Sequence, residues 1–400
     1  MAGIKPAMTK RGNMLTSRDR ILTTHVGSLP RNDTITELLI KREAGEAIDQ
    51  KQMAAELDRA VAEVVKRQKD AGIDIGNDGE QQRVAFQTYM AARMSGYGGE
   101  SKRRVGKDFL EHPDLVATFG RRFVHRAKIS NAPQAIADVK YTDLGPIRDE
   151  IARFKTHAAG AFAESFMTAP SPGIVATTLM NAHYDSHEAY VNALAKELSK
   201  EYRAIHDAGL ILQVDAPDLA MERVMMFQDE TDDGFVKIAE MHLAAINAAC
   251  AGIPADRWRL HVCWGNWEGP HVYDIALAKV LPVFYQTTAG AISIEFANPR
   301  HQHEYAAFRA HPFPRDKILI PGVIESTSNF VEHPEVVAGR IGQAVAAVGD
   351  RERVIASTDC GFGTFAGREW VAASIVWPKL KTMRDGADLA SQRLWGKKVA

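Results

Sequence analysis

The sequence has few cysteines, no long apolar run and no excess of either charge. Three cysteines in 400 residues are an odd and sparse set, which excludes a disulfide framework and indicates a reducing compartment. No segment approaches the roughly 18 consecutive apolar residues of a membrane span. The 49 basic side chains are nearly balanced by 50 acidic ones, so no global charge attracts a polyanion. A cytoplasmic protein without a nucleic-acid or membrane partner is expected.

The first residues of the chain, 1–20, are basic and poor in acidic side chains. They lack the apolar segment that a secretory signal needs. An organellar transit peptide is one alternative, but a disordered or extended tail is the favoured interpretation. Residues 21–400 are then expected to form a single catalytic domain.

Short apolar segments alternate with long amphipathic ones along the rest of the chain, which is typical of βα units and a parallel sheet. The segments 49–70 and 186–206 have apolar residues at helical spacing. Eight repeats favour an α/β fold of the closed TIM (β/α)8 barrel type. The eight candidate strands are residues 21–29, 73–79, 165–170, 210–216, 259–264, 291–296, 317–324 and 354–359.

One stretch, residues 95–141, does not follow this alternation. It begins with a glycine-rich segment, ends with a strand-like run at 135–141 and carries many basic side chains, among them Arg121 and Arg122. We expect an insertion after the second strand that is mobile in part and folds over the mouth of the barrel. Its charge run is more typical of a solvated face than of an anion site.

Four candidate metal ligands lie at the carboxyl ends of strands, where the active site of a parallel barrel is found. His261 and Cys263 are two residues apart on one strand, so their side chains project to the same face. Glu295 and Cys360 close two later strands. Two thiolates, an imidazole and a carboxylate favour Zn²⁺ over cations that prefer all-oxygen shells. Each residue alone also fits a structural role, as a small buried side chain or an ion-pair partner.

Other strand ends carry polar residues that could hold a zwitterion. His25 and Ser28 follow the first strand, Glu80 follows the second and Asp215 follows the fourth. The two carboxylates would take an amine, and the hydroxyl with neighbouring backbone N–H groups would take a carboxylate. The alternative is that these residues cap helices and form turns.

Two further motifs compete with this interpretation. His301 and His303 are a rival metal pair, but they follow a strand end within a loop, where contacts to substrate or to the metal ligands are favoured. The glycine-rich segment 359–367 is similar to a phosphate-binding loop. The favoured alternative is that its glycines let the backbone pass close to the metal. Cys250 is expected in the core.

Seven segments resemble, in the same order, the catalytic barrel of the cobalamin-independent methionine synthase family. They are TTHVGSLPR, DGEQQR, LQVDAPDLA, LHVCW, ISIE, IPGVIES and STDCG. The resemblance implies a zinc ion that activates a homocysteine thiol, and a binding site for that amino acid. The implied zinc ligands are His261, Cys263, Glu295 and Cys360, and the implied substrate-binding residues are Ser28, Glu80 and Asp215.

The sequence departs from the folate-using members of this family in three respects. They carry a second, N-terminal barrel that is not expected here. Their DEPA motif reads DAPD at residues 215–218, and their histidine after the seventh strand is matched by Thr327. A polyglutamyl folate donor is therefore not expected. The chain resembles the short single-barrel members, which include core methionine synthases and epoxyalkane:coenzyme M transferases.

The leading hypothesis is a zinc-dependent S-alkyltransferase that methylates a homocysteine-like thiol to give methionine. Its partners are a small-molecule thiol acceptor and an alkyl donor, and His25 or Glu325 is a candidate acid for the leaving group. One alternative is opening of an epoxide by coenzyme M, whose sulfonate would need a basic residue such as Arg121 or Arg122. Another is a zinc-binding or thiol-sensing barrel without catalysis.

Overall fold

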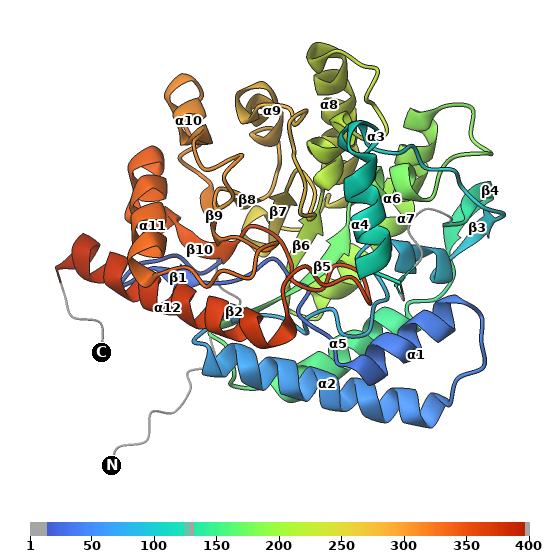
Figure 1. Cartoon of the computed structure of the whole chain (residues 1–400), viewed down its shortest axis with the longest axis horizontal. Coiled ribbons are helices and arrows are strands. Elements are labelled where there is room, and N and C mark those ends of the chain that lie inside the picture. Colours follow the sequence, from blue (N-terminus) through green and yellow to red (C-terminus); the bar gives the residue numbers. More distant parts are fainter. Residues whose placement is uncertain (1–13, 125, 128–131, 397–400) are drawn as a thin grey trace.

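The protein is described by a computed structural model that covers residues 14–124, 126–127 and 132–396. Eight parallel strands form a nearly closed barrel with helices around it, so the expected TIM barrel is confirmed (Figure 1). The strands are hydrogen-bonded in the order β1-β10-β9-β8-β7-β6-β5-β2. They are β1 (Leu22–Thr23), β2 (Ile75–Gly76), β5 (Glu164–Pro170), β6 (Ile211–Asp215), β7 (Trp258–Val262), β8 (Ala291–Ile294), β9 (Ile318–Ile324) and β10 (Ile355–Thr358).

The barrel closes between β1 and β2 through individual hydrogen bonds. The backbone N–H of Asp74 donates to Thr23 O at 3.1 Å, and Thr24 Oγ1 donates to Ile75 O at 2.8 Å. Each of the eight expected strand segments contains one observed strand. Most observed strands end earlier than expected, and the residues after them make separate contacts to other parts of the barrel. The N–H of Leu29, for example, donates to Gly79 O.

Two expected helices are found within one residue of their sequence-based bounds, as α2 (Gln50–Asp70) and α7 (His187–Asp207). Asp49 and Ser186 precede them and cap their first N–H groups, as short polar side chains do. The other helices around the barrel are α1 (Asp33–Glu43), α5 (Gly145–Ala158), α6 (Pro172–Thr178), α8 (Asp232–Ala249), α9 (Leu277–Phe284), α10 (Ala307–Ala310), α11 (Pro334–Val348) and α12 (Ala373–Trp395). Short 3₁₀ turns are η1 (Thr88–Ala92), η2 (Pro217–Leu219), η3 (Met221–Arg223), η4 (Ala255–Arg257), η5 (Glu304–Ala306) and η6 (Arg351–Arg353).

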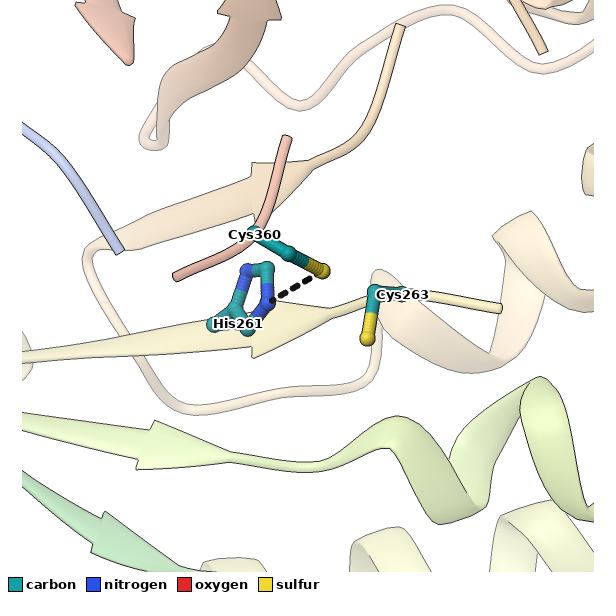
Figure 2. A group of neighbouring side chains, drawn as sticks. All are labelled: His261, Cys263 and Cys360. Atoms are coloured by element: carbon teal, nitrogen blue, oxygen red, sulfur yellow. Dashed lines mark hydrogen bonds between the residues drawn. The ribbon is translucent and has the colours of Figure 1, made fainter. Parts of the chain in front are cut away.

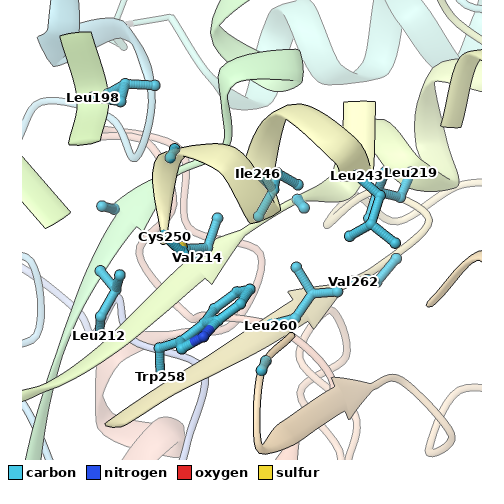
Figure 3. Close-up of a cluster of buried hydrophobic side chains, with 14 of the residues drawn as sticks. Leu198, Leu212, Val214, Leu219, Leu243, Ile246, Cys250, Trp258, Leu260 and Val262 are labelled. Atoms are coloured by element: carbon cyan, nitrogen blue, oxygen red, sulfur yellow. The ribbon is translucent and has the colours of Figure 1, made fainter. Parts of the chain in front are cut away.

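The main apolar core lies between the strands and the surrounding helices. Cys250, at the end of α8, is buried there as expected, close to Val214 and Trp258 of neighbouring strands (Figure 3). Among the helices that the structure describes, none combines the length and the apolar character needed to cross a membrane.

The chain before β1 is described from Met14 onward; residues 1–13 of the expected tail lie outside the described part. Met14 is buried in a cluster with barrel residues that include Phe166 and Ile355. The Ser17 hydroxyl donates to Val354 O at 2.6 Å. This segment therefore packs against the barrel.

An insertion follows β2, as expected, and precedes α5. It contains the antiparallel hairpin of β3 (Met94–Gly98) and β4 (Gln134–Tyr141), and between them α3 (Lys107–Glu111) and α4 (Pro113–Arg122). Residues 125 and 128–131 lie outside the described part. The Phe109 ring packs at a tilt against Trp267 with 4.4 Å between ring centroids, and Phe119 contacts Trp370 edge to face at 4.8 Å. Aromatic contacts thus fix α3 and α4 to the loops that follow β7 and β10.

Candidate metal and substrate site

His261, Cys263 and Cys360 meet at the carboxyl ends of two strands. His261 lies in β7, Cys263 follows that strand directly, and Cys360 follows β10. Their ligand atoms all lie within 4.8 Å of one another, and all three side chains are buried (Figure 2). Two sulfurs and an imidazole nitrogen in this arrangement are suited to a tetrahedral metal such as Zn²⁺.

The His261 imidazole is neutral and held in one orientation. Burial, together with the charge of Arg259, lowers the pKa of His261 to about 3. Ser293 Oγ lies 3.3 Å from Nδ1, and Nε2 lies 3.8 Å from Cys360 Sγ. A neutral ring with one nitrogen occupied by a neighbouring hydroxyl presents the other nitrogen as a ligand.

The two thiols differ in acidity because they interact with each other. A hydrogen bond from Cys360 lowers the pKa of the Cys263 thiol, and the same interaction together with burial raises the pKa of Cys360. Loss of a proton is thus easier at Cys263 than at Cys360, and a cation beside the two sulfurs would favour the thiolate form of both.

Glu295, the fourth expected ligand, lies next to this group but is not one of its members. The backbone N–H of Trp264 donates to Glu295 Oε1 at 2.7 Å, and Asn298 Nδ2 donates to Oε2 at 3.3 Å. Burial raises the pKa of Glu295 well above its ordinary value, and Cys263 adds to this rise although His301 opposes it. A cation at the cysteines would stabilise the ionised carboxylate of Glu295 and so lower this pKa.

The three expected substrate-binding residues line the same cavity as the His261, Cys263 and Cys360 group. Other lining residues come from the loops around the barrel mouth and from the insertion. The lining includes Ser28, Glu80, Asp215, Phe86, Gln87, Arg103, Phe109, Met221, Trp267, Thr364, Phe365 and Arg368. Six of the seven expected metal ligands and substrate-binding residues thus lie around one cavity, and Glu295 is the exception.

Glu80 and Asp215 are buried carboxylates that face a shared space. Thr168 Oγ1 donates to Glu80 Oε1 at 2.8 Å, while Glu80 Oε2 is buried without a hydrogen-bond partner. Burial raises the pKa of both groups, and the charge of Glu80 raises that of Asp215 further. The backbone of Glu80 has a φ of 55°, a conformation that non-glycine residues rarely adopt and that is concentrated at functional sites. Two close acids in this setting are suited to bind an ammonium group.

Ser28 is positioned by the glycine-rich segment after β10. A Cβ atom on Gly361 would lie 2.0 Å from Ser28 Oγ, and the N–H of Phe362 donates to Ser28 O at 2.8 Å. Gly361 therefore allows the two loops to approach each other. This supports the close-approach interpretation of the glycines, with Ser28 as the neighbour.

The two candidate acids lie outside this cavity. His25 is buried, its Nε2 is 2.8 Å from Gln68 Oε1, and burial lowers its pKa to about 4. Glu325 lines a second cavity beyond Trp267, and its carboxylate accepts hydrogen bonds from the backbone N–H groups of Thr327 and Ser328 at 2.6 Å each.

His271 and His301 line the second cavity and are joined behind it by Asp274, a connection that the sequence did not predict. Asp274 Oδ2 lies 2.9 Å from His271 Nδ1 and 3.1 Å from His301 Nε2. Hydrogen bonds to Asp274 and Glu304 raise the pKa of His301 to about 10 although burial opposes this. His301 stands out in the sequence only beside His303, and its link to His271 and Asp274 joins two loops without periodic spacing. Within the described ranges, His301 and His303 do not form a metal-ligating group.

The basic residues in the first cavity are not the expected ones. Arg122 pairs with Glu268 and donates to Trp370 O, and Arg121 Nη2 contacts Thr118 Oγ1 at 3.1 Å; neither lines the cavity. Arg103 and Arg368 do. Sequence position alone did not distinguish these arginines, because the insertion and the last loop are rich in them.

The barrel and the buried thiol and imidazole group at its strand ends are those of an α/β-barrel enzyme. The profile of the cobalamin-independent synthase family, catalytic domain, matches residues 21–108 and 128–388. The chain belongs to this family, which confirms the resemblance seen in the sequence. It is accordingly an enzyme of the methyltransferase class rather than a non-catalytic barrel.

Curated relatives share its length. A protein named methionine synthase from Thermococcus kodakarensis is 25% identical over 93% of this chain and 94% of its own. Another of that name from Saccharolobus islandicus is 24% identical over 93% and 95%. A B12-independent methionine synthase from Shewanella sp. W3-18-1, solved in complex with selenomethionine, has the same fold, with a TM-score of 0.71 at 20% identity over 94% of this chain and all of that one.

Proposed function

We propose that the protein is a zinc-dependent methyltransferase that methylates the thiol of homocysteine or a close analogue to give methionine. The observation that carries the proposal is a single cavity bounded by His261, Cys263 and Cys360 on one side and by Glu80 and Asp215 on another. The first set is suited to a metal that binds a thiol, and the second to the ammonium group of an amino acid. Relatives named methionine synthase support this assignment.

The residues fit zinc on chemical grounds. Two thiols and a neutral imidazole lie within 4.8 Å of one another, and the buried carboxylate of Glu295 lies beside them with a raised pKa. We assign the four ligands to His261, Cys263, Cys360 and Glu295. When bound there, zinc would hold the acceptor thiol deprotonated at neutral pH.

The amino acid is oriented by residues of this chain. Glu80, held by Thr168, and Asp215 receive the ammonium group. Ser28 and the backbone N–H groups beside it receive the carboxylate. This leaves the thiol directed at the cysteines, so that its sulfur forms the new bond to the methyl carbon while the donor keeps the electron pair of the bond that breaks.

The positions of the two candidate acids bear on which methyl donor fits the site. His25 lines neither cavity, and Glu325 lines only the second cavity, where its carboxylate accepts hydrogen bonds from two backbone N–H groups. Glu325 therefore keeps the place of candidate acid on position alone. The arrangement favours a donor whose leaving group is stable without a proton, and it gives no support to a polyglutamyl folate.

Metal analysis tests the proposal. Purified wild-type protein should carry one zinc per chain, and Cys263→Ser and Cys360→Ser should each lose it, whereas Cys250→Ala should retain it because Cys250 lies in the core. Methyl transfer to homocysteine should disappear with the metal. Full zinc occupancy in both serine variants would refute the assignment.

A second candidate is epoxide opening by a sulfonate thiol such as coenzyme M. The observation that favours it is Arg368, a basic side chain in the cavity wall without an acidic partner among the described residues. Turnover of an epoxide with 2-mercaptoethanesulfonate but not of homocysteine with methyl donors would select this candidate.

A further inference from the structure

Arg368 lines the cavity with the candidate metal ligands, and no acidic side chain among the described residues neutralises its charge. It lies in the loop after β10 and lines the cavity together with Cys263 and Cys360. Its Nε is buried without a hydrogen-bond partner, and no ion pair joins its guanidinium to a carboxylate of residues 14–124, 126–127 or 132–396. The donors of this side chain are therefore available to a ligand.

Aromatic rings hold the guanidinium in place. Its carbon lies 5.1 Å from the ring centroid of Trp370, 5.7 Å from that of Phe365 and 5.8 Å from that of Phe123. Contacts of this kind fix a guanidinium through its faces and leave its N–H edge for an acceptor. The position is thus organised in advance for recognition of a planar or tripodal anion.

The other arginines near the cavity have partners. Arg103 pairs with the buried Glu222, and Arg31 donates to Gly363 O and Glu80 O. Burial, together with the charge of Arg126, lowers the pKa of Arg368 to about 10. Nearby charge thus opposes that of Arg368 rather than neutralising it, which costs energy that an anionic ligand would recover.

We propose that Arg368 binds an oxyanion, a carboxylate or a sulfonate, of a substrate that occupies the metal cavity. The inference rests on the proposed function, because it takes the cavity as the site of thiol alkylation. Glu80 and Asp215 provide negative charge elsewhere on the lining, and Phe86, Phe109 and Trp267 provide apolar surface. A ligand matched to this lining has an apolar body and at least one acidic group.

Because the proposed function places the homocysteine carboxylate at Ser28, the oxyanion at Arg368 belongs either to the alkyl donor or to an acidic thiol acceptor used in place of homocysteine. Binding measurements distinguish the two. For the acceptor, zinc-loaded protein is titrated with three thiols of similar size: 2-mercaptoethanesulfonate, 3-mercaptopropionate and uncharged 2-mercaptoethanol. For the donor, protein saturated with homocysteine is titrated with propanesulfonate and butyrate, which have no thiol. Calorimetry gives the dissociation constants, and the Trp267 and Trp370 fluorescence reports binding in the cavity.

Arg368→Gln is compared with Arg368→Lys and with Arg121→Gln, which removes the same charge from an exposed position outside the cavity. If the acceptor carries the oxyanion, Arg368→Gln should raise the dissociation constants of the two acidic thiols about 10-fold or more. The dissociation constant of 2-mercaptoethanol should not change. If the donor carries the oxyanion, Arg368→Gln should cause a similar loss of affinity for propanesulfonate or butyrate. Arg368→Lys should keep part of the affinity, and Arg121→Gln should match wild type.

Equal affinities of wild type and Arg368→Gln for every acidic probe would overturn the proposal. Zinc content separates this failure from failure of the proposed function. If Arg368→Gln retains zinc and thiol binding but shows no loss for acidic probes, the function stands and the role of Arg368 falls. If the wild type binds no zinc, the function falls, and titration of the metal-free protein with propanesulfonate still decides the role of Arg368.

Discussion

Cys360 Sγ lies 3.8 Å from His261 Nε2 although 99 positions separate the two residues along the chain. The barrel produces this contact: β7 and β10 are parallel strands whose carboxyl ends open on the same mouth. Cys263 joins them because it follows His261 by two residues at the end of the same strand. A site assembled in this way depends on closure of the whole barrel.

Metal binding should therefore stabilise the fold. We expect zinc removal by a chelator to lower the melting temperature of the wild type, since a ligand at a thousand times its dissociation constant adds about 4 kcal/mol to the free energy of unfolding. Cys360→Ser should melt at one temperature with and without chelator. A wild-type protein that loses its zinc without any change in melting temperature would contradict this expectation.

Glu80→Gln should impair binding of the amino group specifically. The variant removes the negative charge that we propose to bind the ammonium group of homocysteine. The KM for homocysteine should therefore rise about 10-fold or more. For 3-mercaptopropionate, which has no ammonium group, the KM should stay close to the wild-type value. Steady-state kinetics with the two thiols decide the matter, and an equal loss with both would argue for a structural role of Glu80.

Asp215→Asn should stabilise the metal-free protein in a pH-dependent manner. Burial and the charge of Glu80 raise the folded-state pKa of Asp215 well above its unfolded value of about 3.9. The ionised carboxylate thus reduces wild-type stability increasingly as pH rises from about 4 towards the folded-state pKa. The gain in melting temperature from Asp215→Asn should be larger at pH 8 than at pH 4. The exposed Asp185→Asn is the control, and a gain that shrinks with rising pH would refute the argument.

Gly361→Ala should displace Ser28. The added Cβ would lie 2.0 Å from Ser28 Oγ, and overpacking of this kind costs about 1–3 kcal/mol. We expect a lower melting temperature and a raised KM for homocysteine. Gly342→Ala in α11, where a Cβ meets nothing within 4 Å, should instead gain about 0.5–1 kcal/mol from helix propensity. Calorimetric melting of both variants measures the difference, and equal changes would exclude a specific clash.

The strands and the placing of His261 and Cys263 side by side could be predicted from the sequence because both depend on short-range patterns. Apolar runs mark the strands, and the two-residue spacing of His261 and Cys263 puts both on one face. Strand ends were predicted less well: β1 ends at Thr23, and the residues after it make only separate contacts, such as the bond from the Thr24 N–H to Ala356 O of β10. The hydrogen bond of Glu295 to the Trp264 N–H was not predictable, since it depends on how two loops fold after their strands.

The cavity lining was the least predictable part. Arg121 and Arg122 were as plausible in sequence as Arg103 and Arg368, and only the packing of the insertion on the barrel separates them. The chain of His271, Asp274 and His301 was missed for a similar reason, because its members come from two loops that meet in space. Loop contacts are set by tertiary packing rather than by local pattern.

Aromatic contacts of α3 with Trp267 and of α4 with Trp370 hold the inserted segment against the barrel, so two parts of the chain form the cavity wall. The barrel strands and the residues just after them carry the two thiols and the imidazole, whereas the inserted segment contributes Arg103 and Phe109 to the cavity wall. We therefore expect exchange of the inserted segment to change which ligands the cavity accepts, while the thiols and the imidazole keep their positions.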